Sequence, residues 1–278
     1  MKPIEAHPLA EYLAAAVEAA TIGAAILEDW RAKFHVTEKE RNNLVTEADI
    51  ASQKAVRASL LGKFPDHAFV GEEDHFGHSI ESTRPTGDAP AWIVDPLDGT
   101  CNYVHDLPAY CVSIGLWIHG EPVVGVILDP RMKELFTCAK GHGAFLNGQP
   151  MKVSKTAKLG DSLLCTGFPS NYETQLRNLE AWKRVAKHSQ SIRRTGSTAL
   201  NLAYVACGRL DGYWAYDNWS WDVAAGAALV LEAGGALNAA DGAPFDPFRM
   251  DCCATNGLVQ GELLKALKGE VILSEPEA

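Results

Sequence analysis

A chain of 278 residues with 47% hydrophobic and 22% charged residues has the composition of an ordinary soluble globular protein, which argues against the disordered and membrane classes. The formal net charge of −10 argues against general nucleic-acid binding, because affinity for a phosphate backbone depends on an excess of Lys and Arg. Seven cysteines without a C-x-x-C pair argue against a disulfide framework or a zinc knuckle, so we expect reduced thiols. The first residues lead into no signal-peptide core and we expect no membrane span, so we expect a cytoplasmic protein.

The N-terminal part of the chain carries two helix patterns. Apolar residues recur at helical spacing from Pro8 to about Phe34, which predicts a long amphipathic helix. No apolar run is expected to reach the roughly 18 to 20 residues of a membrane span, so we expect no membrane segment. Residues 35–43 are polar and aperiodic and are predicted to form a loop. Thr46-x-x-Asp49 has the form of a capping box, which predicts a second helix and explains Asp49 as a first-turn residue.

Strand patterns follow, with helix patterns more frequent after about residue 150. Ala68–Val70 and Ala91–Val94 are short apolar runs typical of buried strands, and Asn147-Gly148 signals a hairpin at the end of an antiparallel meander. No repeat or linker marks a boundary, so we expect one domain over residues 1–278, of the α/β (or α+β) class with layered helices and sheets. The other predicted elements are strands at 110–118, 122–128, 135–139, 212–214 and 236–238, and helices at 172–188, 197–207, 221–230 and 261–267.

Two carboxylates follow the Ala91–Val94 strand, in the segment Asp95–Thr100 (DPLDGT). Pro96 cannot continue a central strand and the following Asp-Gly pair favours a turn, so we expect the backbone to fold back and bring Asp95 and Asp98 together. Converging carboxylates repel unless a cation lies between them, and Mg²⁺ prefers such oxygen ligands. If the last two residues of the segment open a helix, their N–H groups would face an anion. A strand followed by an Asx-type turn explains the same residues without a metal.

Further acidic residues lie at the ends of predicted elements. Glu72-Glu73-Asp74 follows a strand; as an exposed cluster it costs little, whereas facing the Asp95–Thr100 segment it would need a metal. Asp222 begins a predicted small-residue helix, where an N-cap role is also an explanation. His75 and His78 are separated like metal ligands, but the flanking Gly and Ser favour a surface loop.

Taken together, these segments resemble the inositol monophosphatase family of Mg²⁺-dependent, lithium-sensitive phosphatases. The order and spacing match along nearly the whole chain. The resemblance implies a five-layer α-β-α-β-α sandwich, usually seen as a homodimer. The matching segments are Gly71-Glu72-Glu73, Asp95–Thr100, Trp221-Asp222-x-x-x-Gly226, Thr46-x-x-Asp49, Arg194-Thr195-Gly196-Ser197 and Ala206–Gly212.

The resemblance also implies roles for individual residues. Glu72, Asp95 and the Leu97 carbonyl would hold the first Mg²⁺, and Asp95, Asp98 and Asp222 the second, with a third and weaker cation at Glu72. This gives two to three ions per subunit. Glu72, Asp49 and Thr100 are the implied catalytic residues, with Thr100 hydrogen-bonded to Asp49 so that it orients the attacking water. Substrate contacts are implied for Asp98, Gly99, Thr100, Cys101, Gly196, Ser197 and Asp222.

These residues predict a Mg²⁺-dependent phosphomonoesterase that acts on inositol monophosphate or a similar polyol phosphate. A phosphate monoester repels hydroxide, and metal ions can neutralise its charge, acidify water and stabilise the leaving alkoxide. We expect direct in-line attack by a metal-bound water, with an aspartyl nucleophile as the rival mechanism. No nucleic-acid or membrane partner is expected.

Three departures from the family pattern limit the prediction of the substrate. Cys101 stands where a second threonine is usual, and Asp106 stands where a basic or neutral residue is common. The more serious departure is Ala215, which stands where inositol phosphatases carry an acid that binds sugar hydroxyls. An alanine methyl cannot accept those hydrogen bonds, so Asp217 or Asn218 would have to substitute, or the substrate is a different small phosphate. The alternatives are histidinol phosphate, fructose 1,6-bisphosphate, 3′-phosphoadenosine 5′-phosphate, and a partner-binding regulatory role.

Overall fold

The fold is assembled from helices and strands, with an uninterrupted run of strands from β5 to β9. The structure, a computed structural model, describes residues 6–31, 33–40, 43–74, 79, 83–87 and 89–270. Its helices are α1 (Ala6–Trp30), α2 (Glu47–Lys63), α3 (Thr100–Val104), α4 (Tyr172–Ala186), α5 (Thr198–Ala206), α6 (Ser220–Glu232) and α7 (Gln260–Lys268). Its strands are β1 (Val36–Glu40), β2 (Asn43–Thr46), β3 (Ala68–Gly71), β4 (Ala91–Asp98), β5 (Cys111–Ile118), β6 (Glu121–Asp129), β7 (Glu134–Ala139), β8 (Ala144–Leu146), β9 (Gln149–Met151), β10 (Leu163–Thr166), β11 (Ser191–Arg193), β12 (Gly212–Tyr216), β13 (Ala236–Asn238) and β14 (Asp251–Thr255).

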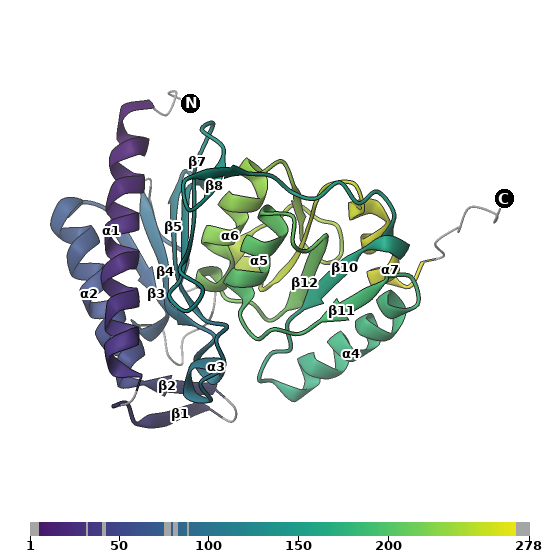
Figure 1. Cartoon of the computed structure of the whole chain (residues 1–278), viewed down its shortest axis with the longest axis horizontal. Helices are drawn as coiled ribbons and strands as arrows, with labels where there is room; N and C mark the ends of the chain where they lie inside the picture. The colour runs from purple at the N-terminus through teal and green to yellow at the C-terminus, as the bar shows by residue number, and fades with distance from the viewer. Residues whose placement is uncertain are drawn as a thin grey trace.

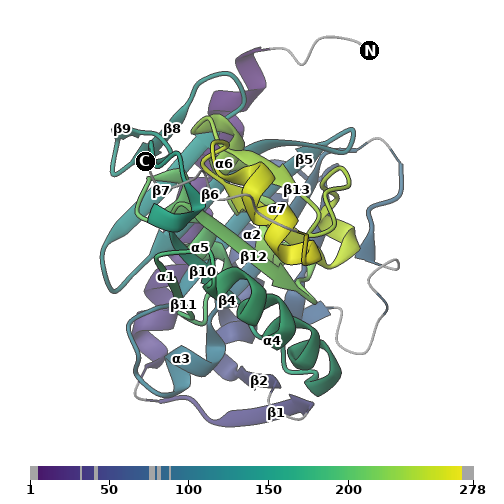
Figure 2. The ribbon, with the colours of Figure 1, turned by 90° about the vertical axis from the view of Figure 1, so that its right-hand side faces the viewer.

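Two sheets and three helical layers form a sandwich (Figure 1). The first sheet has seven strands in the order β3-β4-β5-β6-β7-β8-β9, and α1 and α2 cover its outer face. Helices α5 and α6 lie between it and the second sheet, which has five strands in the order β11-β10-β12-β14-β13. Seen from the right-hand side of Figure 1, α4 and α7 lie in front of the second sheet (Figure 2). This arrangement confirms the predicted α-β-α-β-α layers.

Local sequence rules account for most of the first sheet and its helices. Thr46 caps α2 in a capping box in which Asp49 accepts from the Thr46 backbone, as predicted. The predicted meander is present as β5, β6 and β7 in antiparallel register. Asn147 and Gly148 both have positive φ, at 49° and 75°, as a tight hairpin turn requires.

Five strands are not predicted from the sequence, namely β1, β2, β10, β11 and β14. The polar segment expected to be a loop forms β1, which pairs antiparallel with β2. Its sequence, Val-Thr-Glu-Lys-Glu, lacks the apolar alternation that marks a half-buried strand. Strands β10, β11 and β14 have no clear pattern because they are three to five residues long and contain Cys, Ser, Thr and charged residues. The second half therefore contains a complete sheet as well as the predicted helices.

The sequence of α1 contradicts the expectation that no apolar run reaches the length of a membrane span. Residues Pro8–Trp30 reach a hydropathy of 1.4 and are long and apolar enough to cross a membrane by length and composition. In the fold, however, α1 packs on α2 and on β5 and β6, with Ala16, Ala20 and Leu27 fully buried. Burial against α2 and the first sheet thus explains part of the apolar content of the helix, since 39% of its apolar window is buried.

Helix α6 lies directly on the first sheet because small residues face each other. A Cβ at Gly115 on β5 would lie 2.9 Å from the Ala224 Cβ, and one at Gly125 on β6 would lie 2.5 Å from the Ala225 carbonyl oxygen. On the other side of α6, a Cβ at Gly226 would lie 2.4 Å from the Leu202 Cβ of α5. These close approaches determine the distance between the first turn of α6 and the first sheet.

Candidate active site

The first two carboxylates of the site lie on a bulged strand. The predicted fold-back at Pro96 is wrong: β4 continues to Asp98 and stays paired with β5. Asp95 lies opposite Ser113 and Asp98 lies opposite Cys111. An advance of three residues along β4 therefore pairs with an advance of only two residues along β5. The extra residue is a β-bulge, which accommodates a proline without a ladder hydrogen bond. Because side chains alternate along a strand, the bulge returns Asp98 to the face that carries Asp95.

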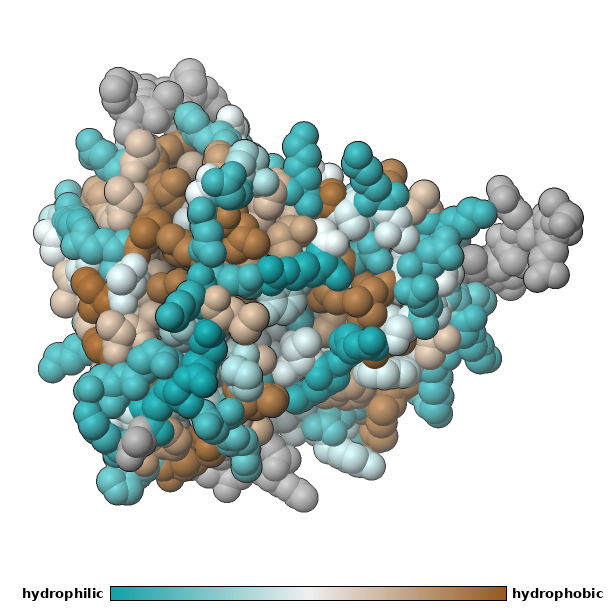
Figure 3. Space-filling view, viewed as in Figure 1, coloured by the Kyte–Doolittle hydropathy of each residue, from teal (hydrophilic) through white to brown (hydrophobic). Residues whose placement is uncertain are grey.

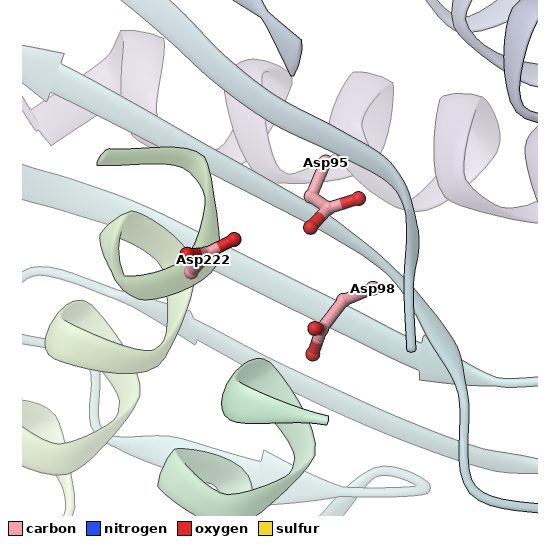
Figure 4. A group of neighbouring side chains, drawn as sticks. All are labelled: Asp95, Asp98 and Asp222. Carbon is pink, nitrogen blue, oxygen red and sulfur yellow. The ribbon is translucent and has the colours of Figure 1, made fainter. Parts of the chain in front are cut away.

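Helix α6 adds a third carboxylate to this pair. One oxygen from each of Asp95, Asp98 and Asp222 lies within 4.8 Å of the others (Figure 4). Asp95 and Asp98 are 2% and 8% exposed. In the part of the chain that the structure describes, no Lys, Arg or His forms an ion pair with any of the three. Three converging acids thus share a largely buried space without a protein counter-charge.

Hydrogen bonds hold each carboxylate in place. Asp98 accepts from the Ser197 hydroxyl and from the backbone N–H groups of Thr198 (3.3 Å) and Ala199 (2.7 Å), at the N-terminus of α5. Asp95 accepts from the Leu97 N–H at 2.9 Å. Asp222 accepts from the Trp219 N–H at 2.7 Å, which is the capping contact expected for a residue in the first turn of α6.

Burial raises the pKa of all three carboxyls. For Asp95 the largest cause is desolvation, and the charges of Glu72, Asp98 and Asp222 raise its pKa further. Desolvation likewise raises the pKa of Asp98 to about 6, although its hydrogen bonds oppose the shift. The pKa of Asp222 is also raised, by desolvation and then by the charge of Asp98. A set of oxygen donors that is this crowded fits a hard divalent cation such as Mg²⁺.

These shifts predict how pH affects the metal-free protein. A carboxyl whose pKa is raised by folding holds its proton longer in the folded state, so its contribution to stability is full below about pH 4 and is lost as pH rises through the folded-state pKa. For Asp98 that upper limit is about 6. We therefore expect the free energy of unfolding in EDTA to decrease between about pH 4.5 and about 7. Urea titrations should show a shallower decrease for Asp95→Asn, and equal slopes for the two proteins would contradict the assignment.

Glu72, Asp49 and Thr100 lie around the three aspartates. Glu72, in the short 3-10 turn after β3, is close enough for its charge to raise the pKa of Asp95, but it lies outside the 4.8 Å group. The Thr100 hydroxyl lies 3.2 Å from a carboxylate oxygen of Asp49 and 3.1 Å from the Leu97 carbonyl oxygen. Asp49 therefore serves as a helix-capping residue and also contacts Thr100, and its part in orienting water stays a prediction.

The segment after the bulge opens a helix, as the sequence predicts. Gly99 has a φ of 96°, and a Cβ there would lie 2.8 Å from the Ala109 carbonyl oxygen, so only glycine fits. Helix α3 begins at the next residue, and Cys101 is exposed in its first turn. Gly196 also has positive φ (97°) and precedes Ser197, the N-cap of α5. His75 and His78 lie outside the described residues.

A comparison with protein families identifies the chain. The family model described as "Inositol monophosphatase family" matches residues 9–271. The chain belongs to the inositol monophosphatase family. This confirms the family predicted from the sequence, and it classes the chain as a phosphoric monoester hydrolase.

Relatives and solved structures of the family agree over most of the chain. An inositol-1-monophosphatase from Synechocystis is 42% identical over 247 residues, which are 88% of this chain and 84% of that protein. The structure of an inositol monophosphatase from Anabaena superposes with a TM-score of 0.83 at 40% identity, covering 95% of this chain and 98% of that one. A Nus factor SuhB from Pseudomonas aeruginosa is 41% identical over 73% of this chain and 74% of its own length.

Two contacts that hold the candidate site together have no clear signal in the sequence. Asn102 of α3 donates to the carbonyls of Ala109 (2.7 Å) and Thr195 (3.0 Å), which ties α3 to the segment that follows it and to the loop before α5. The backbone N–H groups at the start of α5 reach Asp98 across the space between the sheets. The Ser197-Thr198 pair is a usable signal for a helix start, but nothing local in the sequence indicates that an acid from β4 caps it.

Proposed function

We propose that this inositol monophosphatase family member hydrolyses inositol monophosphate or a similar small polyol phosphate in a Mg²⁺-dependent reaction. The observation that supports this best is the convergence of Asp95, Asp98 and Asp222 without a cationic partner among the described residues, in a chain whose relatives include named inositol monophosphatases. We further propose that Glu72, Asp95, Asp222, Asp98 and the Leu97 carbonyl hold two to three Mg²⁺ ions.

Other residues of the chain would position the attacking water and bind the phosphate and alcohol parts of the substrate. The Thr100 hydroxyl, fixed by Asp49 and the Leu97 carbonyl, would position the attacking water. Gly99, Thr100 and Cys101 would present backbone N–H groups to the phosphate, and Gly196 and Ser197 would border the alcohol. Mg²⁺ bound by these carboxylates would supply neutralisation of the phosphate charge, a more acidic water and stabilisation of the leaving alkoxide. With the aspartates engaged as ligands, we favour direct attack by water over an aspartyl-phosphate intermediate.

The first experiment measures phosphate release by the purified full-length chain. Inositol 1-phosphate, histidinol phosphate, fructose 1,6-bisphosphate and 3′-phosphoadenosine 5′-phosphate are compared side by side with Mg²⁺, with EDTA, and with Mg²⁺ plus Li⁺. We expect the highest kcat/KM for inositol 1-phosphate, no turnover in EDTA, and inhibition by Li⁺. Preference for another of the four would reassign the substrate, and a phosphorylated Asp trapped during turnover would overturn the direct mechanism.

A second candidate is a regulatory role through a macromolecular partner. The observation that favours it is the 41% identity to a protein named Nus factor SuhB. If Asp95→Asn abolishes turnover but leaves the cellular phenotype of the wild type intact, this role gains support. Full loss of the phenotype would favour the phosphatase.

The proposal extends to the domain organisation, the oligomeric state and the cellular location of the protein. We propose that residues 1–278 act as one domain, because the site takes Asp95 and Asp98 from the first sheet and Asp222 from the second half of the chain. We also propose a homodimer in the cytoplasm. The free state of all seven cysteines is compatible with a reducing compartment. Figure 3 shows apolar surface at the upper left, and exposed apolar surface is of the kind that protein partners cover.

A further inference from the structure

Helix α2 turns buried polar side chains toward the segments that form the candidate site. Asp49 and Ser52 are fully buried and Gln53 is 6% exposed. Their spacing of three and four residues places them on one face of the helix. Asp49 contacts the Thr100 hydroxyl, and Ser52 donates to the Pro96 carbonyl in the β4 bulge at 3.1 Å. Since a buried polar group costs stability unless it is hydrogen-bonded, this face of α2 suits these neighbours and not an apolar core.

The Gln53 amide lies against the turn that carries Glu72. Its Oε1 accepts from the Glu73 backbone N–H at 2.9 Å. A Cβ at Gly71, the last residue of β3, would lie 2.4 Å from the same oxygen, so a glycine there leaves the space that the amide occupies. The amide therefore contacts the residues on both sides of Glu72.

Arg57, one turn further along α2, holds the same segment before and after Glu72. The guanidinium carbon of Arg57 lies 4.4 Å from the centre of the Phe69 ring on β3. The guanidinium also forms an ion pair with Asp74, the last residue of the 3-10 turn. This ion pair is partly exposed and is therefore weaker than a buried contact. The nearly buried Gln53 amide is thus the contact of α2 that lies closest to Glu72.

The strand register places Glu72 beside Asp95. Strands β3 and β4 are parallel, and Gly71 pairs with Val94 in the last pair between them. Glu72 and Asp95 are the next residues of the two strands, and neighbouring strands lie about 5 Å apart. A small movement of the turn after β3 would therefore change the distance between these two carboxylates.

We propose that Gln53 is a positioning residue for Mg²⁺ binding, because its amide holds the turn after β3 so that Glu72 and Asp95 can bind the same ion. Groups that orient metal ligands commonly affect metal affinity strongly without touching the metal. Gln53 acts through Glu72 and not on the substrate. This inference rests on the proposed phosphatase function, in which Glu72 and Asp95 hold the first Mg²⁺.

Gln53→Met tests the inference, since Met has a similar length and volume but offers only a weak acceptor to the Glu73 N–H. Isothermal titration calorimetry of the purified full-length chain with Mg²⁺ alone should give a Kd about 10-fold higher than that of the wild type. At saturating Mg²⁺, the KM for inositol 1-phosphate should stay within about twofold of the wild type. Gln53→Glu keeps an acceptor oxygen and should keep the Kd for Mg²⁺ at or below the wild-type value.

Gln260→Met is the matched control. Gln260 begins α7, on the opposite side of the sandwich from α2. Its side chain accepts from the Thr255 hydroxyl at 2.6 Å and donates to the Asn238 side-chain oxygen at 3.0 Å. We expect this variant to lower Tm in EDTA and to leave the Kd for Mg²⁺ unchanged. A double variant of Gln53→Met and Glu72→Gln should bind Mg²⁺ as weakly as Glu72→Gln alone, because the amide acts through the Glu72 carboxylate.

Failure of the inference can be distinguished from failure of the proposed function. If the wild type binds no Mg²⁺, the proposed function fails and the inference fails with it. If the wild type binds Mg²⁺ and Gln53→Met binds it equally well, the inference alone is overturned. An equal rise in Kd in Gln260→Met, or a further loss of affinity in the double variant, would show that Gln53 supports the fold in general and does not act through Glu72.

Discussion

Replacement of Asp95 by Asn is expected to reduce kcat about 1,000-fold and at the same time to stabilise the metal-free protein. Asp95 lies close to the other acids of the site, and the loss of one metal-binding carboxylate removes several kcal/mol of transition-state stabilisation. Without metal, the same carboxylate is buried among like charges, and its raised pKa shows that its ionisation opposes folding. Thermal unfolding should give a higher Tm than the wild type in EDTA and a smaller gain in Tm on addition of Mg²⁺.

Asp129→Asn is the matched control for this variant. Asp129 is fully buried at the end of β6, and burial raises its pKa to about 6. One of its oxygens accepts from the N–H groups of Arg131 and Met132, which Asn can preserve, and the other has no partner among the described residues. This variant should keep the wild-type kcat. A lower Tm of metal-free Asp95→Asn, or a large loss of kcat in Asp129→Asn, would contradict the account.

The second large effect concerns the contact between α6 and the first sheet. Gly125→Ala would place a Cβ 2.5 Å from the Ala225 carbonyl oxygen, so the helix or the strand must move. Overpacking against backbone costs about 3 kcal/mol, which corresponds to a fall in Tm of roughly 6–10 °C for a chain of this size. Because Ala225 is one turn from Asp222, the Mg²⁺ concentration for half-maximal activity should rise as well.

Gly62→Ala makes the same chemical change where there is room. Gly62 lies in α2, and no atom lies within 4 Å of the position that an alanine Cβ would occupy. Alanine is favoured over glycine in a helix by about 0.5–1 kcal/mol, so this variant should raise Tm slightly and leave activity unchanged. If both variants changed Tm by the same amount, close packing under α6 would not be the cause.

The parts of the fold that local rules govern could be predicted from the sequence. The capping box at Thr46 and the Asn147-Gly148 hairpin depend on a few adjacent residues, and both are present. The bulge in β4 could not be predicted because it is defined by the partner strand: Pro96 alone favours a turn, and only pairing with β5 keeps the chain extended. The five residues of β14 likewise carry no periodic signal, although the strand pairs with neighbours on both sides.

In the candidate active site too, features set by adjacent residues could be predicted, whereas features set by the packing of distant elements could not. Asp95, Asp98 and Asp222 can each be named from the sequence, but each also has a local explanation as a turn or capping residue. Asp222 does make its capping contact, so the local explanation is correct yet incomplete. The convergence of the three depends on α6 packing on the sheet, which no local pattern reveals, and only the family resemblance anticipates it.

The order of the two sheets along the chain has a consequence for how the protein matures on the ribosome. Every strand of the seven-stranded sheet ends by Met151, whereas every strand of the five-stranded sheet begins at or after Leu163. The first sheet can therefore pair before its inner cover, α5 and α6, has been synthesised, because chains emerge and fold from the N-terminus. Asp95 and Asp98 are therefore positioned on the first sheet before Asp222 has been synthesised. A cation that needs all three binds only after the two halves have joined, and from then on it resists their separation.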